Sequence, residues 1–127
     1  MLRLDKYGDT LWTRTYGDSS LEASFQGIQT FDGNIVLIGY SFSFGAGSAD
    51  VYVIKIDLNG DIIWDRTYGG LLDDQAYSIT QTIDSGFAIA GATETYSLKG
   101  TLTNGSVKWV LDSSASASSC YAKGYCK

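Results

Sequence analysis

Three oxygen-bearing side chains in the middle of the chain, Asp57, Asn59 and Asp61, have the spacing with which a calcium-binding loop begins. Such a loop needs a glycine at its sixth position and, at its twelfth, a glutamate that binds the ion through both oxygens. Those two positions hold an isoleucine and a tyrosine here, so the calcium pattern fails. We instead predict that Asn59 and Gly60 form a two-residue hairpin turn.

Two tryptophans and two arginines carry side chains that bind ligands in many proteins. Trp12 and Trp64 could stack on a sugar or a quinone, and Arg14 and Arg66 could bind a carboxylate. The members of each pair are 52 residues apart. A residue that recurs at one position of a repeat usually makes the same structural contact in every unit. We therefore predict that the tryptophans pack against the neighbouring unit, and that the arginines pair with acids or cover aromatic rings.

Acidic and glycine-rich loops offer further candidates. Asp73 and Asp74, with Glu22 near the equivalent place in the first copy, could form an acidic ligand pair, but a solvated loop is the simpler interpretation. Residues 44–49 are rich in glycine, yet neither the Lys-Ser or Lys-Thr pair nor the helix of a phosphate-binding loop follows. We predict an ordinary loop at each place.

An aromatic cluster precedes and enters that glycine-rich loop, where Tyr40, Phe42 and Phe44 alternate along the chain. We predict that these rings make a contact between units. The alternative is an exposed patch that binds a glycan or a protein partner.

General acid–base and metal chemistry have few candidate groups. The chain has no histidine, which excludes any mechanism that needs an imidazole base within it. Cys120 and Cys126 lie in the last eight residues, where they form either a local disulfide or a pair of incidental thiols, and a metal site would need more ligands. We identify no catalytic, cofactor-binding or metal-binding residues, and we expect a protein that is not an enzyme.

The elements that position these residues belong to an internal repeat. Residues 5–17 and 57–69 are near-copies of one phrase, separated by 52 residues. Such a period is typical of solenoids, propellers and arrays. The structural repeat residues are Asp5, Gly8, Trp12, Arg14, Tyr16 and Gly17 in the first copy, and Asp57, Gly60, Trp64, Arg66, Tyr68 and Gly69 in the second.

Each unit reads as four short strands joined by tight turns. We expect strands near residues 23–30, 34–41, 51–57 and 61–68, and then near 75–82 and 87–93, with Asp32-Gly33 as another two-residue hairpin turn. No segment is long enough for a crossover helix, so neighbouring strands are predicted to be antiparallel. Apolar residues occupy both alternating sets of positions in the strands, which predicts sheets buried on both faces. Stacked propeller blades provide that environment.

The predicted fold is therefore all-β, with four-stranded antiparallel propeller blades, about two in number, that form an incomplete propeller. Residues 1–22 would be a partial blade with its last strands, 23–70 a complete blade, and 71–100 a second partial blade. Residues 101–127 lose the phrase and form a divergent tail rich in serine and alanine. Because four to eight blades close a propeller, we expect a fragment or decayed copy of a longer protein.

The amino-acid composition limits the classes of partner that the chain could bind. With 14 acids against 9 bases, the chain lacks the clustered positive charge that nucleic acids and anionic membranes attract. No run of 18 apolar residues predicts a membrane span, and the first residues lack the apolar core of a signal peptide. The expected partners are further blades of the same or a neighbouring chain, and a protein or a glycan.

The second copy resembles bacterial and archaeal cell-surface β-propeller repeat proteins, and its Asp-x-x-Gly-x-x-x-Trp core is similar to the docking motif of quinoprotein-type propellers. The matching residues are Lys55, Asp57, Asn59, Gly60, Trp64, Tyr68, Gly69, Gly70, Ser78, Ile79, Thr82, Asp84, Gly86, Ala90 and Gly91. The first copy departs at Tyr7 and at Gln26-Gly27, and the tail has no match.

This resemblance implies a non-catalytic structural or interaction module, part of a surface or secreted propeller, and an extracellular or cell-surface location. The alternatives are a fragment of a propeller enzyme similar to the quinoprotein dehydrogenases, and a glycan-binding module.

Overall fold

The computed structural model describes residues 1–94 and 107–108, and every regular element in them is a strand. The strands are β1 (Leu2–Leu4), β2 (Thr10–Thr13), β3 (Glu22–Gln29), β4 (Ile35–Ser41), β5 (Asp50–Ile56), β6 (Ile62–Tyr68), β7 (Asp74–Gln81), β8 (Phe87–Thr93) and β9 (Val107–Lys108). The prediction of an all-β fold is confirmed, and β3 to β8 begin and end within a residue or two of the predicted bounds. Of the predicted tail, only β9 lies within the described residues, and Cys120 and Cys126 lie outside them.

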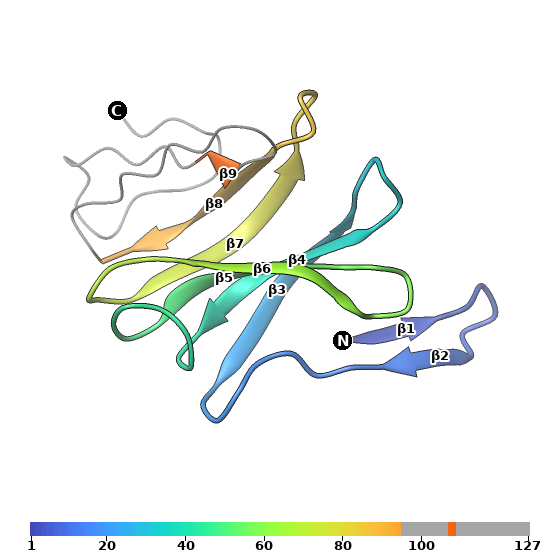
Figure 1. Cartoon of the computed structure of the whole chain (residues 1–127), viewed down its shortest axis with the longest axis horizontal. Coiled ribbons are helices and arrows are strands. Elements are labelled where there is room, and N and C mark those ends of the chain that lie inside the picture. The colour runs from blue at the N-terminus through green and yellow to red at the C-terminus, as the bar shows by residue number, and fades with distance from the viewer. Residues whose placement is uncertain (95–106, 109–127) are drawn as a thin grey trace.

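Three sheets make up the described structure (Figure 1): β1-β2, β3-β4-β5-β6 and β7-β8-β9. Neighbouring strands are antiparallel, as predicted, except that β9 pairs in parallel with β8 at Phe87 and Ala88. In the described residues no sheet closes on itself. No helix in this part of the chain is long and apolar enough to cross a membrane.

The hairpin turns differ from the two-residue turns that were predicted. Thr30 donates its N–H to the carbonyl of Asn34 and accepts from the N–H of Gly33, which leaves three residues in the loop. Such a loop is a tight turn followed by one residue in the left-handed conformation. Gly33 and Gly60 occupy that last position with φ angles of 83° and 85°. The Asp-Gly and Asn-Gly pairs therefore do mark turns, but the loop is one residue longer than predicted.

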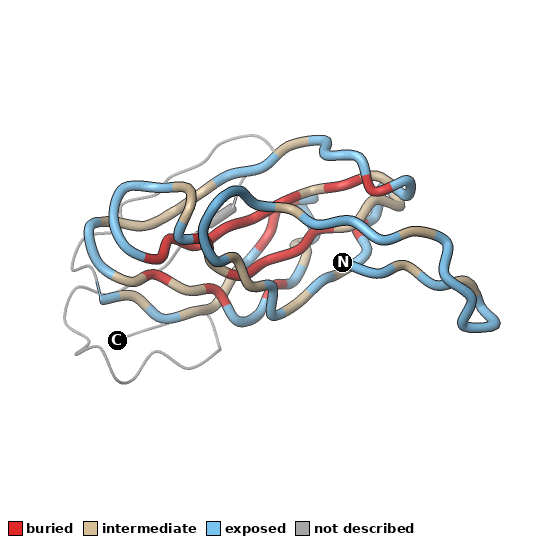
Figure 2. The backbone as a smooth tube through the Cα atoms, turned by 90° about the horizontal axis from the view of Figure 1, so that it is seen from below, coloured by how far each residue is buried: buried red, intermediate tan, exposed pale blue. Residues whose placement is uncertain are grey.

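The two inner strands of the central sheet, β4 and β5, are buried along most of their length (Figure 2). The prediction of burial on both faces is confirmed for these two strands, whereas the edge strands β3 and β6 carry exposed residues. Alternate residues of β4 and β5 belong to two separate apolar clusters. The first contains Val36, Ile38, Val51 and Val53, together with Ala76, Ile79 and Phe87 from β7 and β8. The second contains Leu37, Tyr52, Ile54 and Ile56, with Trp12 and Tyr16 among the partly buried residues packed against it. The β7-β8 hairpin thus covers one face of this sheet, and the segment that holds β2 covers part of the other.

Candidate functional site

The two copies of the repeated phrase form hairpins with the same register. Leu2 lies opposite Thr13 in β1-β2, and Ile54 lies opposite Asp65 in β5-β6. Each of these pairs is the other shifted by 52 residues, and both hairpins shift register at the same place, just before Leu4 and Ile56. The sequence similarity is therefore matched by the same local backbone.

Equivalent aspartates, Asp5 and Asp57, start the two turns. Asp57 Oδ1 accepts the N–H groups of Asn59 and Asp61 at 2.8 and 2.9 Å, and Asp5 Oδ1 accepts those of Tyr7 and Asp9 at the same distances. The hydrogen bond from the Asp61 N–H makes the largest contribution to lowering the Asp57 pKa. The carboxylate that resembled a calcium ligand therefore stabilises its own turn.

Trp12 and Tyr16 dock the first unit onto the turn of the second. The Trp12 indole Nε1–H donates to the carbonyl of Leu58 at 2.9 Å, and the Tyr16 hydroxyl donates to the carbonyl of Gly60 at 2.9 Å. The Trp12 ring also lies so close to Gly60 that an added Cβ there would stand 3.1 Å from it. Burial raises the pKa of Tyr16. These contacts use backbone carbonyls that a three-residue loop leaves available.

Trp64, the equivalent of Trp12 in the second copy, also contacts the next unit along the chain. Its ring meets that of Phe87 in an edge arrangement with centroids 6.3 Å apart, and both Trp64 and Tyr68 pack against the first apolar cluster. Burial raises the pKa of the Tyr68 hydroxyl. In each copy the tryptophan therefore packs between units, as its recurrence predicted.

The two arginines do not make the predicted ion pairs within the described residues, where the one ion pair joins Lys55 to Asp32. Arg66 donates to the carbonyl of Asp65 at 2.6 Å. Arg14 places its Cγ 3.0 Å from the position that a Cβ of Gly60 would take. Arg66 therefore makes a local backbone contact, and the aliphatic stem of Arg14 lies against the turn of the second unit.

The acidic pair at residues 73 and 74 is not a solvated loop, so that prediction is wrong for its second member. Asp74 is fully buried and accepts the Gly70 N–H at 2.8 Å. Asp73 accepts the Ala49 N–H at 3.1 Å, and its pKa is lowered mainly by the Ser48 hydroxyl. The Asp73 carboxylate holds the start of β7 to the loop before β5, whereas the Asp74 carboxylate binds the loop between β6 and β7. The sequence did not reveal these contacts, because the polarity of a loop does not show which segment folds over it.

Asp50 is a buried acid that the sequence analysis missed. Its Oδ2 accepts the N–H groups of Ala46 and Gly47 at 3.0 and 3.4 Å, so the glycine-rich loop wraps around a carboxylate of its own chain. Gly45 has a φ of 118°, and a Cβ there would stand 2.1 Å from that oxygen. Burial raises the pKa of Asp50, and the charge of Asp74 raises it further. The glycines clustered before Asp50 are the sequence feature that could have indicated this buried carboxylate.

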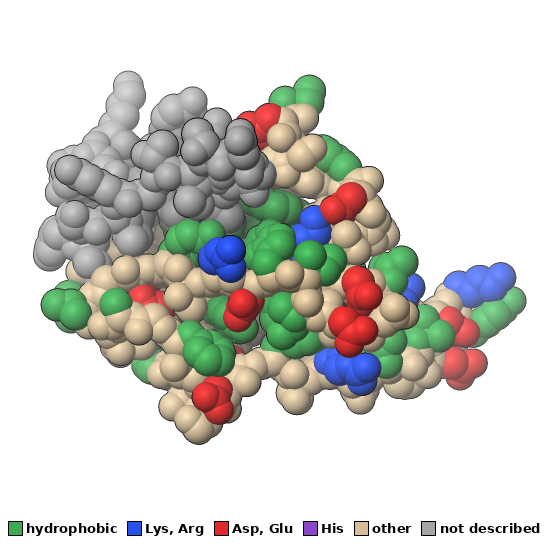
Figure 3. Space-filling view, in the orientation of Figure 1, with side chains coloured by type: hydrophobic (Ala, Val, Ile, Leu, Met, Phe, Trp, Pro, Cys, Tyr) green, Lys and Arg blue, Asp and Glu red, His purple; other side chains and the backbone are tan. Residues whose placement is uncertain are grey.

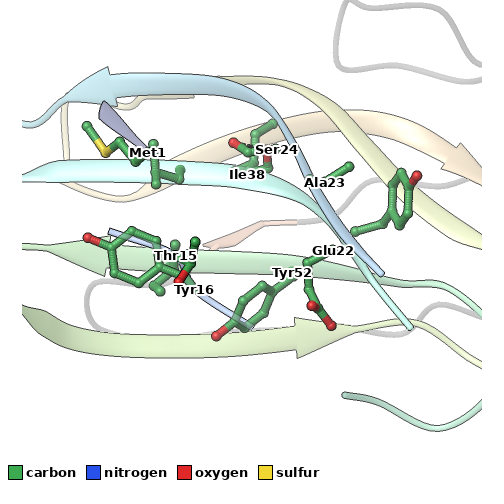
Figure 4. A pocket seen from close by; sticks show the side chains of 12 residues that line it. Met1, Thr15, Tyr16, Glu22, Ala23, Ser24, Ile38 and Tyr52 are labelled. Carbon is green, nitrogen blue, oxygen red and sulfur yellow. Dashed lines mark hydrogen bonds between the residues drawn. The ribbon is translucent and has the colours of Figure 1, made fainter. Parts of the chain in front are cut away.

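A cavity of about 320 Å³ lies between the first unit and the central sheet (Figure 4). Its walls combine apolar strand residues with aromatic and polar side chains: Met1, Thr15, Tyr16, Glu22, Ala23, Ser24, Leu37, Ile38, Gly39, Tyr40, Tyr52 and Ile54. The Ser43 hydroxyl makes the largest contribution to lowering the Glu22 pKa. Burial raises the pKa of Tyr52, whose hydroxyl donates to Asp65 at 2.9 Å. The lining therefore offers an anion and aromatic faces, but no paired acid and base.

A row of four aromatic rings crosses from β7 to the end of β4. Tyr77 meets Phe25 edge-on at 5.2 Å, Phe25 lies 5.7 Å from Tyr40, and Tyr40 lies 5.6 Å from Phe42. Phe44 is not part of this row, because it packs on Tyr52 at 5.4 Å. The three predicted aromatic residues thus divide between a largely exposed row, with Tyr40 and Phe42, and a partly buried contact, with Phe44.

The row contains a second repeated feature. Phe25 and Tyr77 are 52 residues apart, and each lies at a register shift of its strand. A β-bulge of this kind turns one side chain away from the regular alternation. Both rings are about half exposed, at 50% and 48%. Hydrophobic side chains also lie between scattered charged ones on the face shown in Figure 3.

The described residues contain no group of three or more acids or cysteines that could hold a metal ion. No protein-family model matches this sequence, and a search of curated proteins found no match.

Proposed function

We propose that the chain is a non-catalytic structural and interaction module, whose four-stranded antiparallel blades stack face to face as in an incomplete β-propeller. The observation that carries the proposal is the docking of Trp12 and Tyr16 onto the carbonyls of Leu58 and Gly60. Side chains shared by both copies are used to join one unit to the next. A site for chemistry would instead need different residues in different units.

The buried central sheet supports the same proposal. A sheet with apolar side chains on both faces needs another layer on each side. Here β7-β8 supplies one layer, while the two-stranded β1-β2 supplies part of the other. The partners of such a module are further blades, of the same or a neighbouring chain. By its resemblance to surface repeat proteins, we place it in an extracellular or cell-surface protein.

A glycan-binding role is the second candidate, favoured by the half-exposed rings of Phe25 and Tyr77 at their matching bulges. Aromatic faces stack on the apolar faces of sugars. A propeller enzyme similar to the quinoprotein dehydrogenases is less well supported, because Glu22 is the one charged side chain among the cavity's lining residues.

Alanine at the tryptophans tests the module. Replacing Trp12 or Trp64 should lower the free energy of unfolding by about 2–4 kcal/mol in urea denaturation, because each ring packs between units. Tyr7→Ala is the matched control, since Tyr7 is 78% exposed, and it should change stability by less than about 0.5 kcal/mol. Tryptophan variants as stable as the control would refute the docking role. A glycan array with and without Phe25→Ser would separate the second candidate.

A further inference from the structure

The outer edge of β1 carries backbone groups that face away from β2. Met1 and Arg14 exchange two hydrogen bonds, from the Met1 amine at 2.6 Å and from the Arg14 N–H at 2.9 Å. Backbone groups alternate in direction along an antiparallel strand, so the N–H and C=O of Leu2 point to the opposite edge. Among the described residues, no strand pairs with that edge.

The equivalent hairpin within the same chain, β5-β6, shows which strand pairs with such an edge. Its strand β5 is equivalent to β1 and pairs along this edge with β4, with Ile54 opposite Leu37 and Ile56 opposite Ile35. Strand β8 is the equivalent of β4, shifted by 52 residues, and has the same register with β7 that β4 has with β3. Strands β7-β8 and β1-β2 are therefore the two halves of one four-stranded sheet.

A single chain cannot join these halves, because they cover opposite faces of the central sheet. Strand β7 packs on the cluster that contains Val36 and Val53, whereas Trp12 packs on the cluster that contains Leu37 and Ile54. In Figure 1 the sheet β3-β6 lies between the two hairpins.

We propose that β1 of one copy pairs with β8 of a second copy of this chain, so that two copies together complete a four-stranded sheet. This inference rests on the proposed function and names the partner blade. By the register of β4 with β5, Leu2 lies opposite Ile89 of the second copy, and Leu4 lies opposite Phe87.

The side chains on these surfaces fit that pairing. In the interface that the chain itself forms, Val36 and Ile38 of β4 pack against Ala76, Ile79 and Phe87. The equivalent residues of β8 are Ala88 and Ala90, and Ala88 is exposed here. In the proposed pairing, Ala88 and Ala90 would face the residues that lie 52 positions before Ala76, Ile79 and Phe87. Those residues are Ser24, Gly27 and Ile35 of the copy that supplies β1. Ser24 lines the cavity of about 320 Å³, and the other two line a second cavity of about 330 Å³.

The short strand β9 occupies part of the same edge. Val107 and Lys108 pair in parallel with Phe87 and Ala88, where the antiparallel partner of β4 would lie in the equivalent sheet. Because β9 has two residues, it is the weaker competitor for this edge, and the incoming β1 replaces it.

The assembly joins the head of one copy to the tail of the next, and such contacts form rings when the rotation closes. Each copy supplies its central sheet and completes one shared sheet. Since about four to eight blades close a propeller, a ring of about two to four copies is expected.

Proline at Leu2 tests the pairing in the full-length chain. Leu2→Pro removes the N–H that points to the second copy and leaves the β1-β2 hydrogen bonds intact. Thr13→Pro is the matched control, because Thr13 lies opposite Leu2 and its N–H points to the other edge of the hairpin. Light scattering after size exclusion should show a closed oligomer for the unmodified chain and for Thr13→Pro, and a monomer for Leu2→Pro. Circular dichroism should show that all three chains are folded.

Thiol cross-linking tests the strand register without relying on the folding of the proline variant. In a background with Cys120→Ser and Cys126→Ser, copies with Leu2→Cys and copies with Ile89→Cys should join through a short thiol cross-linker. Copies with Ile63→Cys, on exposed β6, should not join to Leu2→Cys. A monomeric unmodified chain, or cross-linking as efficient with Ile63→Cys, would overturn the pairing. The proposed function would still stand in that case if the tryptophan variants lose stability.

Discussion

The hairpins β1-β2 and β5-β6 share the same sequence phrase, strand register and type of turn, yet their surroundings differ. Ile54 and Ile56 are 3% and 0% exposed, whereas the equivalent Leu2 and Leu4 are 52% and 45% exposed. The difference is the neighbouring strand, because β4 pairs with β5 and no described strand pairs with the outer edge of β1. A repeated phrase therefore determines the hairpin locally, while its burial depends on which strands and sheets surround it.

The largest expected effect compares matched strand positions directly. Ile56→Ala should lower the free energy of unfolding by about 2–4 kcal/mol, because a fully buried side chain leaves a cavity. Leu4→Ala, at the equivalent place, should cost less than about 1 kcal/mol when the chain is monomeric, for instance in the Leu2→Pro background. Urea denaturation measures both. Equal losses would show that the two hairpins are buried alike, contrary to the comparison.

A smaller effect concerns the docking of one hairpin onto the other. Tyr16→Phe removes the hydroxyl that donates to the Gly60 carbonyl, and should cost about 1 kcal/mol in the same assay. Tyr7→Phe removes a hydroxyl from an exposed ring and should leave stability unchanged. If the two variants behave alike, the hydrogen bond between the units contributes nothing.

The turns of the two units offer a gain in stability. Gly33 has a φ of 83°, and its equivalent in the next unit is Ser85, with a φ of 65°. A residue with a Cβ is strained in this conformation, by about 1 kcal/mol. Ser85→Gly should therefore raise the melting temperature by a few degrees. A lower melting temperature would show that the serine makes a contact worth more than the strain.

The smallest expected effect depends on pH. Hydrogen bonds from Lys55 and Thr30 lower the pKa of Asp32 in the folded chain, and the one from Lys55 contributes most. A carboxyl whose pKa is lowered by folding stabilises the fold above its unfolded pKa of about 4, and that stabilisation is lost as the pH falls through the folded value. Asp32→Asn should flatten the loss of stability below about pH 4. If the stability of Asp32→Asn falls with pH as steeply as that of the unmodified chain, the Lys55 contact has no effect on stability.

The strands and the burial of β4 and β5 on both faces could be predicted from the sequence, because alternation and turn residues act locally. Val36 and Leu37 are both buried although they point in opposite directions, as their apolar neighbours indicated. The loop length was misjudged, because an Asp-Gly pair fits a two-residue or a three-residue turn. The backbone geometry around Gly33 decides between them.

The candidate site was less predictable, because it depends on contacts between distant segments. The buried Asp74 lies against the loop before β5, where the Ala49 carbonyl accepts its N–H. The acceptors of the Trp12 and Tyr16 hydrogen bonds are backbone carbonyls, which no side-chain pattern marks. The bulges at Phe25 and Tyr77 likewise appear only in the register of the strands. The repeat period indicated that these positions are equivalent, but not that they would be exposed.

Thiol labelling at two adjacent residues of β5 tests most directly whether this strand is covered on both faces. In the Cys120→Ser, Cys126→Ser background, Val53→Cys and Ile54→Cys place thiols on opposite faces of one strand. Both should label slowly in the folded chain, since the parent side chains are 0% and 3% exposed, whereas Ile63→Cys, at a position 48% exposed, should label rapidly. Rapid labelling of either Val53→Cys or Ile54→Cys alone would show a sheet with one face in water, and would contradict the account.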